Sequence, residues 1–261
     1  MDIKTLIKDY LDHLEIEKNR SLKTRDNYER YLKAFFAFAE IGSPSDITEE
    51  SVRSFRLELA RRSLKKITQS YYVIAIRNFL KFLVKKDLNV LSPDKIELPR
   101  VAKMEIDIPE YGDLERLLSS PKNQGLRSLR DKAILEVLFS TGLRLSELCS
   151  LDRYLDLARG EVTVRGKGDK LRLVFLSDRS KAAIKNYLSK RTDADQALFV
   201  SLTRTHSPSQ VPKVLGRIKP RAVQRMVDYW SRKAGLAKKI HPHTLRHAFA
   251  TDLLINGADM R

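Results

Sequence analysis

The sequence is poor in the features that mark secreted, membrane-bound and disordered proteins. Cys149 is the single cysteine, so no disulfide can form within the chain, and we expect a reducing, cytoplasmic location. Only 10 glycines and 9 prolines occur, against 42% hydrophobic residues, which excludes a disordered chain. No stretch reaches the roughly 20 apolar residues that span a bilayer, and the charged opening Met1-Asp2-Ile3-Lys4 is unlike a signal peptide. The length of 261 residues predicts one or two folded domains.

Acidic residues are also scarce relative to basic ones. The chain has 50 Lys and Arg residues against 33 Asp and Glu, a formal charge of +17. Such an excess favours a polyanionic partner, either nucleic acid or an anionic membrane surface, although part of any such excess is ordinary solvated surface. Residues 109–261 hold 29 basic and 16 acidic residues, whereas residues 1–108 hold 21 and 17, so most of the excess lies in the second half.

Apolar residues recur at helical spacing through the first part of the chain. They predict helices over residues 3–18, from 21–24 to 39, over 46–60 and from 68 to 83. Asp46 with Glu49 is expected to cap the third helix, and Thr68 the fourth. Four amphipathic helices make a small bundle, so residues 1–88 are assigned to a helical domain. Residues 89–108 contain Pro93 and Pro99 and no sustained period, which predicts an extended linker.

The rest of the chain, residues 109–261, mixes helical and β patterns. Helical spacing predicts helices over 113–118, 129–140, 145–151, 180–189, 220–235 and 242–256. Two short β-prone runs, 161–165 and 171–176, flank a glycine-containing loop at 166–170 and predict a hairpin. Residues 203–220 carry no clear pattern and are expected to be a loop. The predicted fold class is mainly α with a small antiparallel β-hairpin or sheet: a four-helix domain followed by an α+β domain.

Four residues of the second domain carry the chemistry of interest, namely Arg144, Lys167, His243 and Arg246. Each has an ordinary reading when taken alone, because an arginine or histidine at a helix start and a lysine at a hairpin tip are common. His243 and Arg246 lie three positions apart and so share one helix face. His243 and His247 have the spacing of a helical zinc pair, but Thr244 stands where that motif has its glutamate. No carboxylate cluster is evident either, so no bound metal is expected.

Three segments of this half resemble the catalytic boxes of tyrosine-type site-specific DNA recombinases. Residues 141–148 (Thr-Gly-Leu-Arg-Leu-Ser-Glu-Leu) are similar to the family's first-arginine motif. Residues 165–170 are similar to its β-hairpin lysine motif, and residues 241–251 to its His-x-x-Arg box. The three boxes occur in family order, and the helical first domain resembles the family's core-binding domain. The compact Xer-like and phage-integrase-like members are the most similar group.

The resemblance implies a role for each of these residues. Arg144 and Arg246 would clamp the non-bridging oxygens of a DNA phosphate, since guanidiniums stay charged at any working pH. Lys167 would protonate the leaving 5′ oxygen, and His243 would hydrogen-bond the phosphate or assist that proton transfer. Glu147, one turn from Arg144, would orient the site as the family's acidic residue does, or else is a solvated helix carboxylate. The family's reaction is metal-free, so no metal and no cofactor are expected.

The resemblance also implies that the nucleophile is missing. In the family, a Leu-Gly-His-like motif and then the attacking tyrosine follow the His-x-x-Arg box. This sequence ends at Arg261, and the last of its nine tyrosines is Tyr229. We expect a recombinase cut short before that tyrosine, which binds DNA but cannot form a 3′-phosphotyrosyl intermediate. The alternatives are a catalytically degenerate recombinase-like DNA-binding protein, a type IB topoisomerase, and a basic helical regulator without an active site.

Double-stranded DNA is the expected partner, enclosed by the two domains, and the intact protein is expected to act as a tetramer on DNA. Basic and amide side chains would neutralise phosphates or read base edges. The candidates in the first domain are Arg61, Arg62, Lys65, Lys66, Arg77 and Lys81. Those in the second domain, at the start of a predicted helix, are Lys219, Arg221, Gln224 and Arg225.

Overall fold

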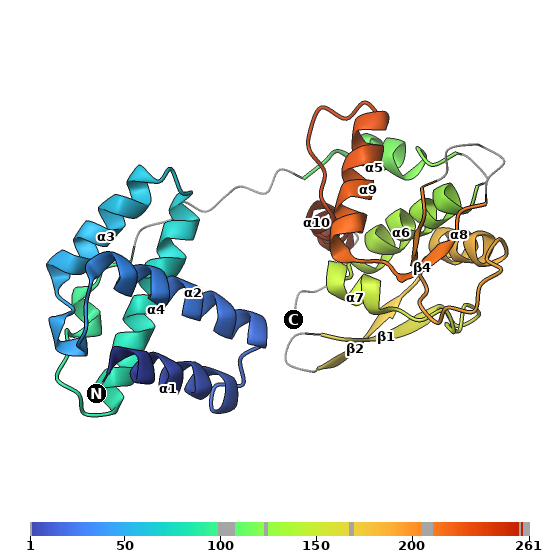
Figure 1. Ribbon diagram of the computed structural model, residues 1–261. Coiled ribbons are helices and arrows are strands. Elements are labelled where there is room, and N and C mark those ends of the chain that lie inside the picture. The colour runs from blue at the N-terminus through green and yellow to red at the C-terminus, as the bar shows by residue number, and fades with distance from the viewer. Residues whose placement is uncertain are drawn as a thin grey trace. The chain divides into compact units, whose positions relative to one another are not determined.

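The computed structural model describes residues 2–98, 108–122, 125–166, 170–204, 211–255 and 257. The chain divides into two compact units, Met1–Met104 and Glu105–Arg261 (Figure 1). The described elements are mainly helices with two short antiparallel hairpins, so the predicted fold class is confirmed. In the described part of the chain, no helix combines the length and the apolar character that crossing a membrane requires.

Four helices form the first unit: α1 (Ile3–Ile16), α2 (Leu22–Ala39), α3 (Glu49–Arg61) and α4 (Lys66–Lys85). Each buries one apolar stripe, because its apolar residues repeat with the helical period. α4 contacts each of the other three helices. Aromatic rings fill the core between them, and Phe35 of α2 meets Phe55 of α3 with ring centroids 5.3 Å apart. The predicted bundle is therefore present.

The helix starts of this unit differ from the predicted caps. Thr48, not Asp46, caps α3: Thr48 Oγ1 accepts from the Ser51 amide at 3.1 Å, and Ser51 Oγ accepts from the Thr48 amide at 3.1 Å. Asp46 instead belongs to a short 3-10 turn, η1 (Pro44–Asp46). Thr68 lies inside the first turn of α4 and is not its cap. Several polar residues near a helix start have the sequence spacing of a capping residue, and only the backbone conformation decides which of them caps the helix.

The chain after α4 folds back onto the bundle instead of extending from it. Pro93 and Ile96 are buried in the core of the first unit, on and beside a short turn, η2 (Pro93–Lys95). Arg77 of α4 fastens this turn, because its Nε donates to the Pro93 carbonyl at 3.0 Å and its Nη2 to Asp94 at 2.9 Å. This part of the predicted extended linker is thus packed structure.

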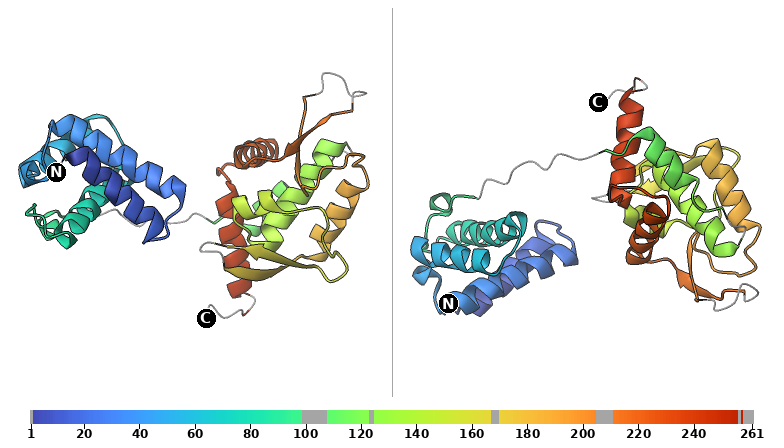
Figure 2. Two further views of the ribbon diagram at one scale, coloured as in Figure 1. Left: turned by 60° about the horizontal axis from the view of Figure 1, so that its bottom comes forward. Right: turned by 90° about the horizontal axis from the view of Figure 1, so that it is seen from above.

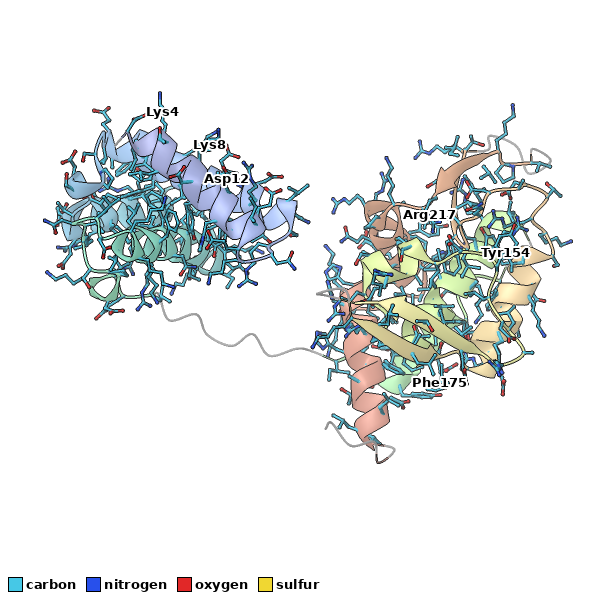
Figure 3. The ribbon with its side chains drawn as sticks, turned by 90° about the horizontal axis from the view of Figure 1, so that it is seen from below. Lys4, Lys8, Asp12, Tyr154, Phe175 and Arg217 are labelled. Atoms are coloured by element: carbon cyan, nitrogen blue, oxygen red, sulfur yellow. The ribbon has the colours of Figure 1, made fainter. Side chains whose placement is uncertain are left out.

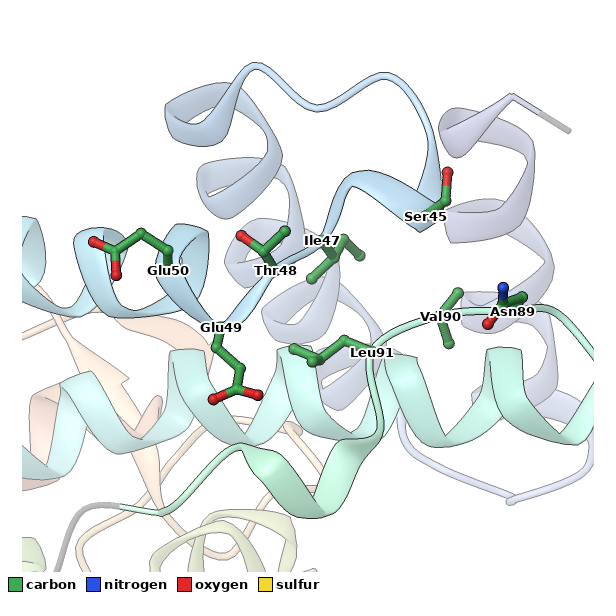
Figure 4. A pocket seen from close by; sticks show the side chains of 8 residues that line it. All are labelled: Ser45, Ile47, Thr48, Glu49, Glu50, Asn89, Val90 and Leu91. Carbon is green, nitrogen blue, oxygen red and sulfur yellow. The ribbon is translucent and has the colours of Figure 1, made fainter.

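A shallow cavity marks where the returning chain meets the loop before α3. It is lined by Ile47 and Thr48 on one side and by Asn89, Val90 and Leu91 on the other (Figure 4). Ile47 is buried, and Val90 and Leu91 pack against the same core. These apolar residues follow no helical or strand period, so the sequence pattern does not record that they complete the bundle.

The second unit contains six helices among the described residues: α5 (Tyr111–Leu118), α6 (Leu126–Thr141), α7 (Leu145–Ser150), α8 (Asp178–Leu188), α9 (Pro220–Lys233) and α10 (Pro242–Ile255). α6 is the central helix, buried on most of its surface, and it contacts α5, α7, α8 and α10 (Figure 2). α9 contacts α7 and α10. Because α6 is surrounded on several sides, its buried positions include charged residues such as Arg130, Asp131 and Glu136 beside apolar ones, so α6 is not strongly amphipathic.

Two separate hairpins complete the described part of this unit (Figure 2). β1 (Glu161–Arg165) and β2 (Leu171–Phe175) pair antiparallel, as predicted. β3 (Val200–Leu202) and β4 (Val214–Arg217) form a second antiparallel pair, and β4 lies inside the stretch 203–220 that was expected to be a loop. That expectation is wrong for β4, because strands of three and four residues with a register shift are too short to show an alternating pattern.

Buried and half-buried polar contacts hold these elements together. Asp131 of α6 accepts from the Trp230 indole of α9 at 2.9 Å and from the neighbouring Arg130 at 2.6 Å. Arg217 of β4, labelled in Figure 3, donates to the carbonyl oxygen of Leu151 at the end of α7 at 2.8 Å. Since buried charges require such partners, these contacts fix where α7, α9 and the β3–β4 hairpin lie.

Candidate active site

A tight turn joins α6 to α7 and presents Arg144. α6 ends at Thr141, Gly142 has a left-handed backbone with φ +56°, and Leu143 is buried. Arg144 then occupies the N-cap position of α7. Glu147 reaches back to it from the first turn: its Oε2 accepts from the Arg144 amide at 2.7 Å and its Oε1 from Arg144 Nη1 at 2.9 Å. One carboxylate therefore caps the helix and orients the guanidinium.

Arg172 of β2 holds the same carboxylate from the hairpin. Its Nη1 donates to Glu147 Oε1 at 2.9 Å and its Nη2 to Oε2 at 2.6 Å, which makes a bidentate ion pair. Glu147 is 5% exposed, so the alternative of a solvated helix carboxylate is wrong. Sequence reasoning missed Arg172. The available signal was a lone arginine between Leu171 and Leu173, just after the lysine loop.

The pKa of the Glu147 carboxyl is lowered to about 2. Burial alone raises this pKa, but the hydrogen bonds from Arg172 and from the amide and side chain of Arg144 outweigh burial. The carboxylate is therefore charged at any pH near neutrality, and its charge is shared between two guanidiniums.

Replacing Glu147 by Gln should change how the stability of the second unit depends on pH. The folded pKa lies below the ordinary value of 4.5, so the carboxylate stabilises the fold above that pH and loses this contribution as the pH falls toward 2. We expect the difference in unfolding free energy between wild type and Glu147→Gln to shrink by about 3 kcal/mol over that range. Urea unfolding at a series of pH values measures it, and a difference independent of pH would contradict the assignment.

Arg246 of α10 closes the other side of the turn. Its Nη1 donates to the carbonyl oxygen of Gly142, which lies 104 positions earlier in the chain. The pKa of Arg246 is lowered, first by partial burial and then by the positive charges of Arg144 and Arg172, against the opposing charge of Glu147. Three guanidiniums therefore lie close enough to repel one another, with one carboxylate among them. This arginine cluster, defined by these four side chains, is a site where a bound anion relieves repulsion.

Close packing between the turn and α10 requires glycine at position 142. Its φ of +56° strains any residue with a side chain. A Cβ at this position would also lie 2.8 Å from Cε1 of Phe249 and closer still to Cδ1 of that ring. Because Phe249 lies one turn after Arg246 on α10, this contact sets how near the helix comes to the turn.

We expect Gly142→Ala to destabilise the second unit by about 2–5 kcal/mol. Left-handed strain contributes about 1–2 kcal/mol of this and overpacking against Phe249 about 1–3 kcal/mol. Gly235→Ala is the matched control, since Gly235 has φ +67° but nothing within 4 Å of an added Cβ. Thermal unfolding of both variants measures the difference. Equal losses would mean that Phe249 moves aside at little cost.

Lys167, the predicted general acid, lies outside the described residues. Its neighbour Gly166 is described, and the Gly166 amide donates to the Lys170 carbonyl at 2.8 Å. A Cβ added to Gly166 would lie 3.1 Å from Arg172 Nη1 and 3.6 Å from Arg144 Nη1. The start of the lysine loop therefore lies beside the guanidiniums of the arginine cluster.

His243 is exposed in the first turn of α10, three positions before Arg246. Pro242 occupies the first helical position, and Thr244 Oγ1 accepts from the His241 amide at 3.2 Å, so the start of α10 is well defined. Across the described residues, no group of three or more His, Cys, Asp or Glu side chains is arranged to hold a metal ion.

The DNA-contact candidates lie on both units. Arg61, Arg62, Lys65 and Lys66 are exposed at the turn between α3 and α4, and Lys81 is exposed on α4. Arg77 is half-buried and holds η2, a structural role that sequence reasoning did not foresee. At the start of α9 lie the exposed Lys219, Arg221 and Arg225, with Gln224 half-buried and bonded to Arg221 at 3.3 Å.

Two sequence profiles match the chain. That of the phage integrase family covers residues 111–261, and that of the phage integrase N-terminal SAM-like domain covers residues 7–87. The tyrosine recombinase XerC of Thermodesulfovibrio yellowstonii is 34% identical over 259 residues, which is 98% of this chain and 84% of that protein. The tyrosine recombinase XerC of Escherichia coli O127:H6 is 37% identical over 273 residues, covering 100% of this chain and 86% of that protein.

Solved structures share the fold at low sequence identity. A lambda integrase (75-356) dimer bound to a COC′ core site gives a TM-score of 0.74 with 14% identity, over 99% of this chain and 92% of that one. A lambda integrase tetramer bound to a Holliday junction gives a TM-score of 0.72 with 14% identity, over 99% and 75%. At this level of identity the similarity shows a common fold.

Proposed function

The chain belongs to the phage integrase family of tyrosine recombinases, and we propose that it serves as a site-specific DNA recombinase, which cuts and rejoins duplex DNA through a 3′-phosphotyrosyl intermediate. The observation that carries this proposal is the arginine cluster, in which Arg144 and Arg172 bind one buried carboxylate and Arg246, from a distant segment, binds the turn beside them. A site of net positive charge fits the anionic phosphate on which such a reaction occurs.

The chemistry follows from the charges. Strand cleavage displaces a DNA oxygen at phosphorus, so negative charge grows on the non-bridging oxygens in the transition state. Arg144 and Arg246 would stabilise that charge, and groups preorganised in this way are often the largest catalytic contribution. Lys167 would protonate the leaving 5′ oxygen, while His243 would hydrogen-bond the phosphate or assist the proton transfer.

We identify no attacking tyrosine beside the arginine cluster among the residues that the structure describes. The hydrogen bonds described for the side chains of Arg144, Arg172 and Arg246 run to Glu147 and to the Gly142 carbonyl. Tyr229, the last in sequence, is 51% exposed on α9 and packs edge-on against Trp230. We propose that this 261-residue chain binds DNA without cutting it, and that cleavage needs a tyrosine supplied from outside these residues. The alternative is a catalytically degenerate recombinase-like DNA-binding protein.

A nicked suicide substrate tests this proposal. The duplex carries a site selected by the protein from random-sequence DNA, and denaturing electrophoresis detects covalent complexes. The 261-residue chain should shift the duplex in a native gel but give no covalent band, whereas a version extended through the tyrosine-bearing segment of the natural gene should give one. A covalent band from the shorter chain, lost in Tyr229→Phe, would place the nucleophile on α9 instead. If the extended version binds the duplex but gives no covalent band, the alternative of a catalytically degenerate DNA-binding protein is correct.

Double-stranded DNA is the proposed partner, and tetramer assembly on DNA is proposed for the intact protein. The exposed basic side chains at the α3–α4 turn and at the start of α9 supply charge for phosphate contacts. Reaction on cellular DNA fits a cytoplasmic location. A type IB topoisomerase would share the chemistry, but it would relax a supercoiled plasmid that lacks any specific site, and this protein should not.

A further inference from the structure

Arg144 and Arg172 bind the same carboxylate in different ways. Arg172 gives both terminal nitrogens to Glu147, at 2.9 and 2.6 Å. Arg144 gives it one terminal nitrogen, at 2.9 Å. Among the described residues, both terminal nitrogens of Arg172 therefore donate to Glu147. The Arg144 guanidinium donates to it through Nη1 only, so the other N–H groups of that guanidinium can donate to another partner. The side chain of Arg144 is also the more exposed of the two, at 42% against 32%.

We propose that Arg172 is a positioning residue for the recombinase reaction. Arg172 neutralises the Glu147 carboxylate. Glu147 can then orient the Arg144 guanidinium with a single hydrogen bond, and the other donors and the positive charge of Arg144 remain available to the DNA phosphate. The inference rests on the function proposed above. Without Arg172, Glu147 would have Arg144 as its nearest cation. The Arg144 guanidinium would then turn into a bidentate pair with the carboxylate and lose donors for phosphate.

The surroundings of Glu147 support this division of labour. The carboxylate is 5% exposed, so solvent cannot take the place of Arg172, and a buried carboxylate without its full set of partners is costly. Arg172 stands opposite Val164 in the antiparallel β1–β2 pair, so its backbone is held by strand pairing. Gly166 lies beside this side chain, since a Cβ placed on Gly166 would come within 3.1 Å of Arg172 Nη1. Arg172 is thus placed on a rigid element to hold Glu147.

The test measures how strongly the protein distinguishes a charged phosphate from a neutral one. Single methylphosphonates are placed along the selected duplex, and the position with the largest effect on wild-type binding is used. We expect wild type to prefer the phosphate over the methylphosphonate by roughly tenfold, from loss of a charged hydrogen-bonded contact. In Arg172→Gln, where Glu147 captures Arg144, that preference should fall below about threefold.

The double variant Glu147→Gln/Arg172→Gln discriminates between mechanisms. Removing the carboxylate frees the donors of Arg144 again, although Glu147 then no longer orients that guanidinium, so the preference should recover in part and exceed that of Arg172→Gln by at least about twofold. If Arg172 instead contacted the phosphate itself or served only to support the fold, the double variant would be no better than Arg172→Gln. Arg179→Gln is the matched control. Arg179 also pairs with a buried glutamate, Glu136 of α6, but neither residue belongs to the arginine cluster.

Each outcome decides between the proposals. Because the preference compares two duplexes on one protein preparation, any unfolded fraction cancels. If wild type binds the phosphate and methylphosphonate duplexes equally, the arginine cluster does not bind a phosphate, and the proposed function is contradicted whatever the result for Arg172→Gln. A clear wild-type preference that Arg172→Gln leaves unchanged, or that the double variant fails to recover even in part, would overturn the role of Arg172 and leave the proposed function standing.

Discussion

Cleavage by the intact recombinase should fall at least about 100-fold when Arg144 or Arg246 is replaced by alanine, while the affinity for DNA should fall by no more than about tenfold. Both guanidiniums lie in the arginine cluster, where partial burial first and the positive charge of Arg144 second lower the pKa of Arg246. Each is expected to stabilise charge that develops in the transition state. A single phosphate is a small part of a duplex interface, so binding depends on them much less.

The measurement is single-turnover formation of the covalent complex on the suicide substrate, with binding followed separately by gel shift. Arg116→Ala is a suitable control, because Arg116 is exposed on α5 and pairs with Asp113 away from the cluster. Arg246→Ala also removes the hydrogen bond to the Gly142 carbonyl, so thermal unfolding of that variant is measured as well. Cleavage at the wild-type rate would take the substituted arginine out of the active site.

Lys167→Ala should slow cleavage of ordinary DNA by about 10² to 10⁴, and a substrate with sulfur in place of the leaving 5′ oxygen should restore the rate. A thiolate leaves without being protonated, so the general acid becomes unnecessary. The start of the lysine loop supports this role: a Cβ placed on Gly166, the residue before Lys167, would lie 3.1 Å from Arg172 Nη1 and 3.6 Å from Arg144 Nη1. Lys167 therefore follows directly in sequence a residue, Gly166, that lies beside the arginine cluster where the phosphate is proposed to bind.

Lys170→Ala is the control for this experiment, because it removes a charge from the other end of the same loop. It should leave the ratio of rates on the oxygen and sulfur substrates unchanged. If Lys167→Ala is impaired equally on both substrates, the lysine binds phosphate or supports the hairpin, and the general acid must be sought elsewhere, with His243 as the next candidate.

Features that depend on neighbours in sequence could be predicted from the sequence. The helices of the first unit follow from apolar residues at helical spacing, as in Tyr31, Leu32 and Phe35 of α2, which are all buried. The β1–β2 hairpin follows from two β-prone runs around a glycine-containing loop. The contact between Arg144 and Glu147 is also local, since three positions within one helical turn bring them together.

Features that depend on distant segments were decided by the tertiary structure. Arg172 meets Glu147 only because the hairpin packs beside α7, and Arg246 reaches Gly142 only because α10 packs on α6. Likewise, the burial of Ile96 in the first unit leaves no periodic signal in sequence. Sequence spacing records contacts within a turn or a strand. The charge balance of the arginine cluster arises from contacts between elements, and those exist only once the helices and the hairpin have packed around α6.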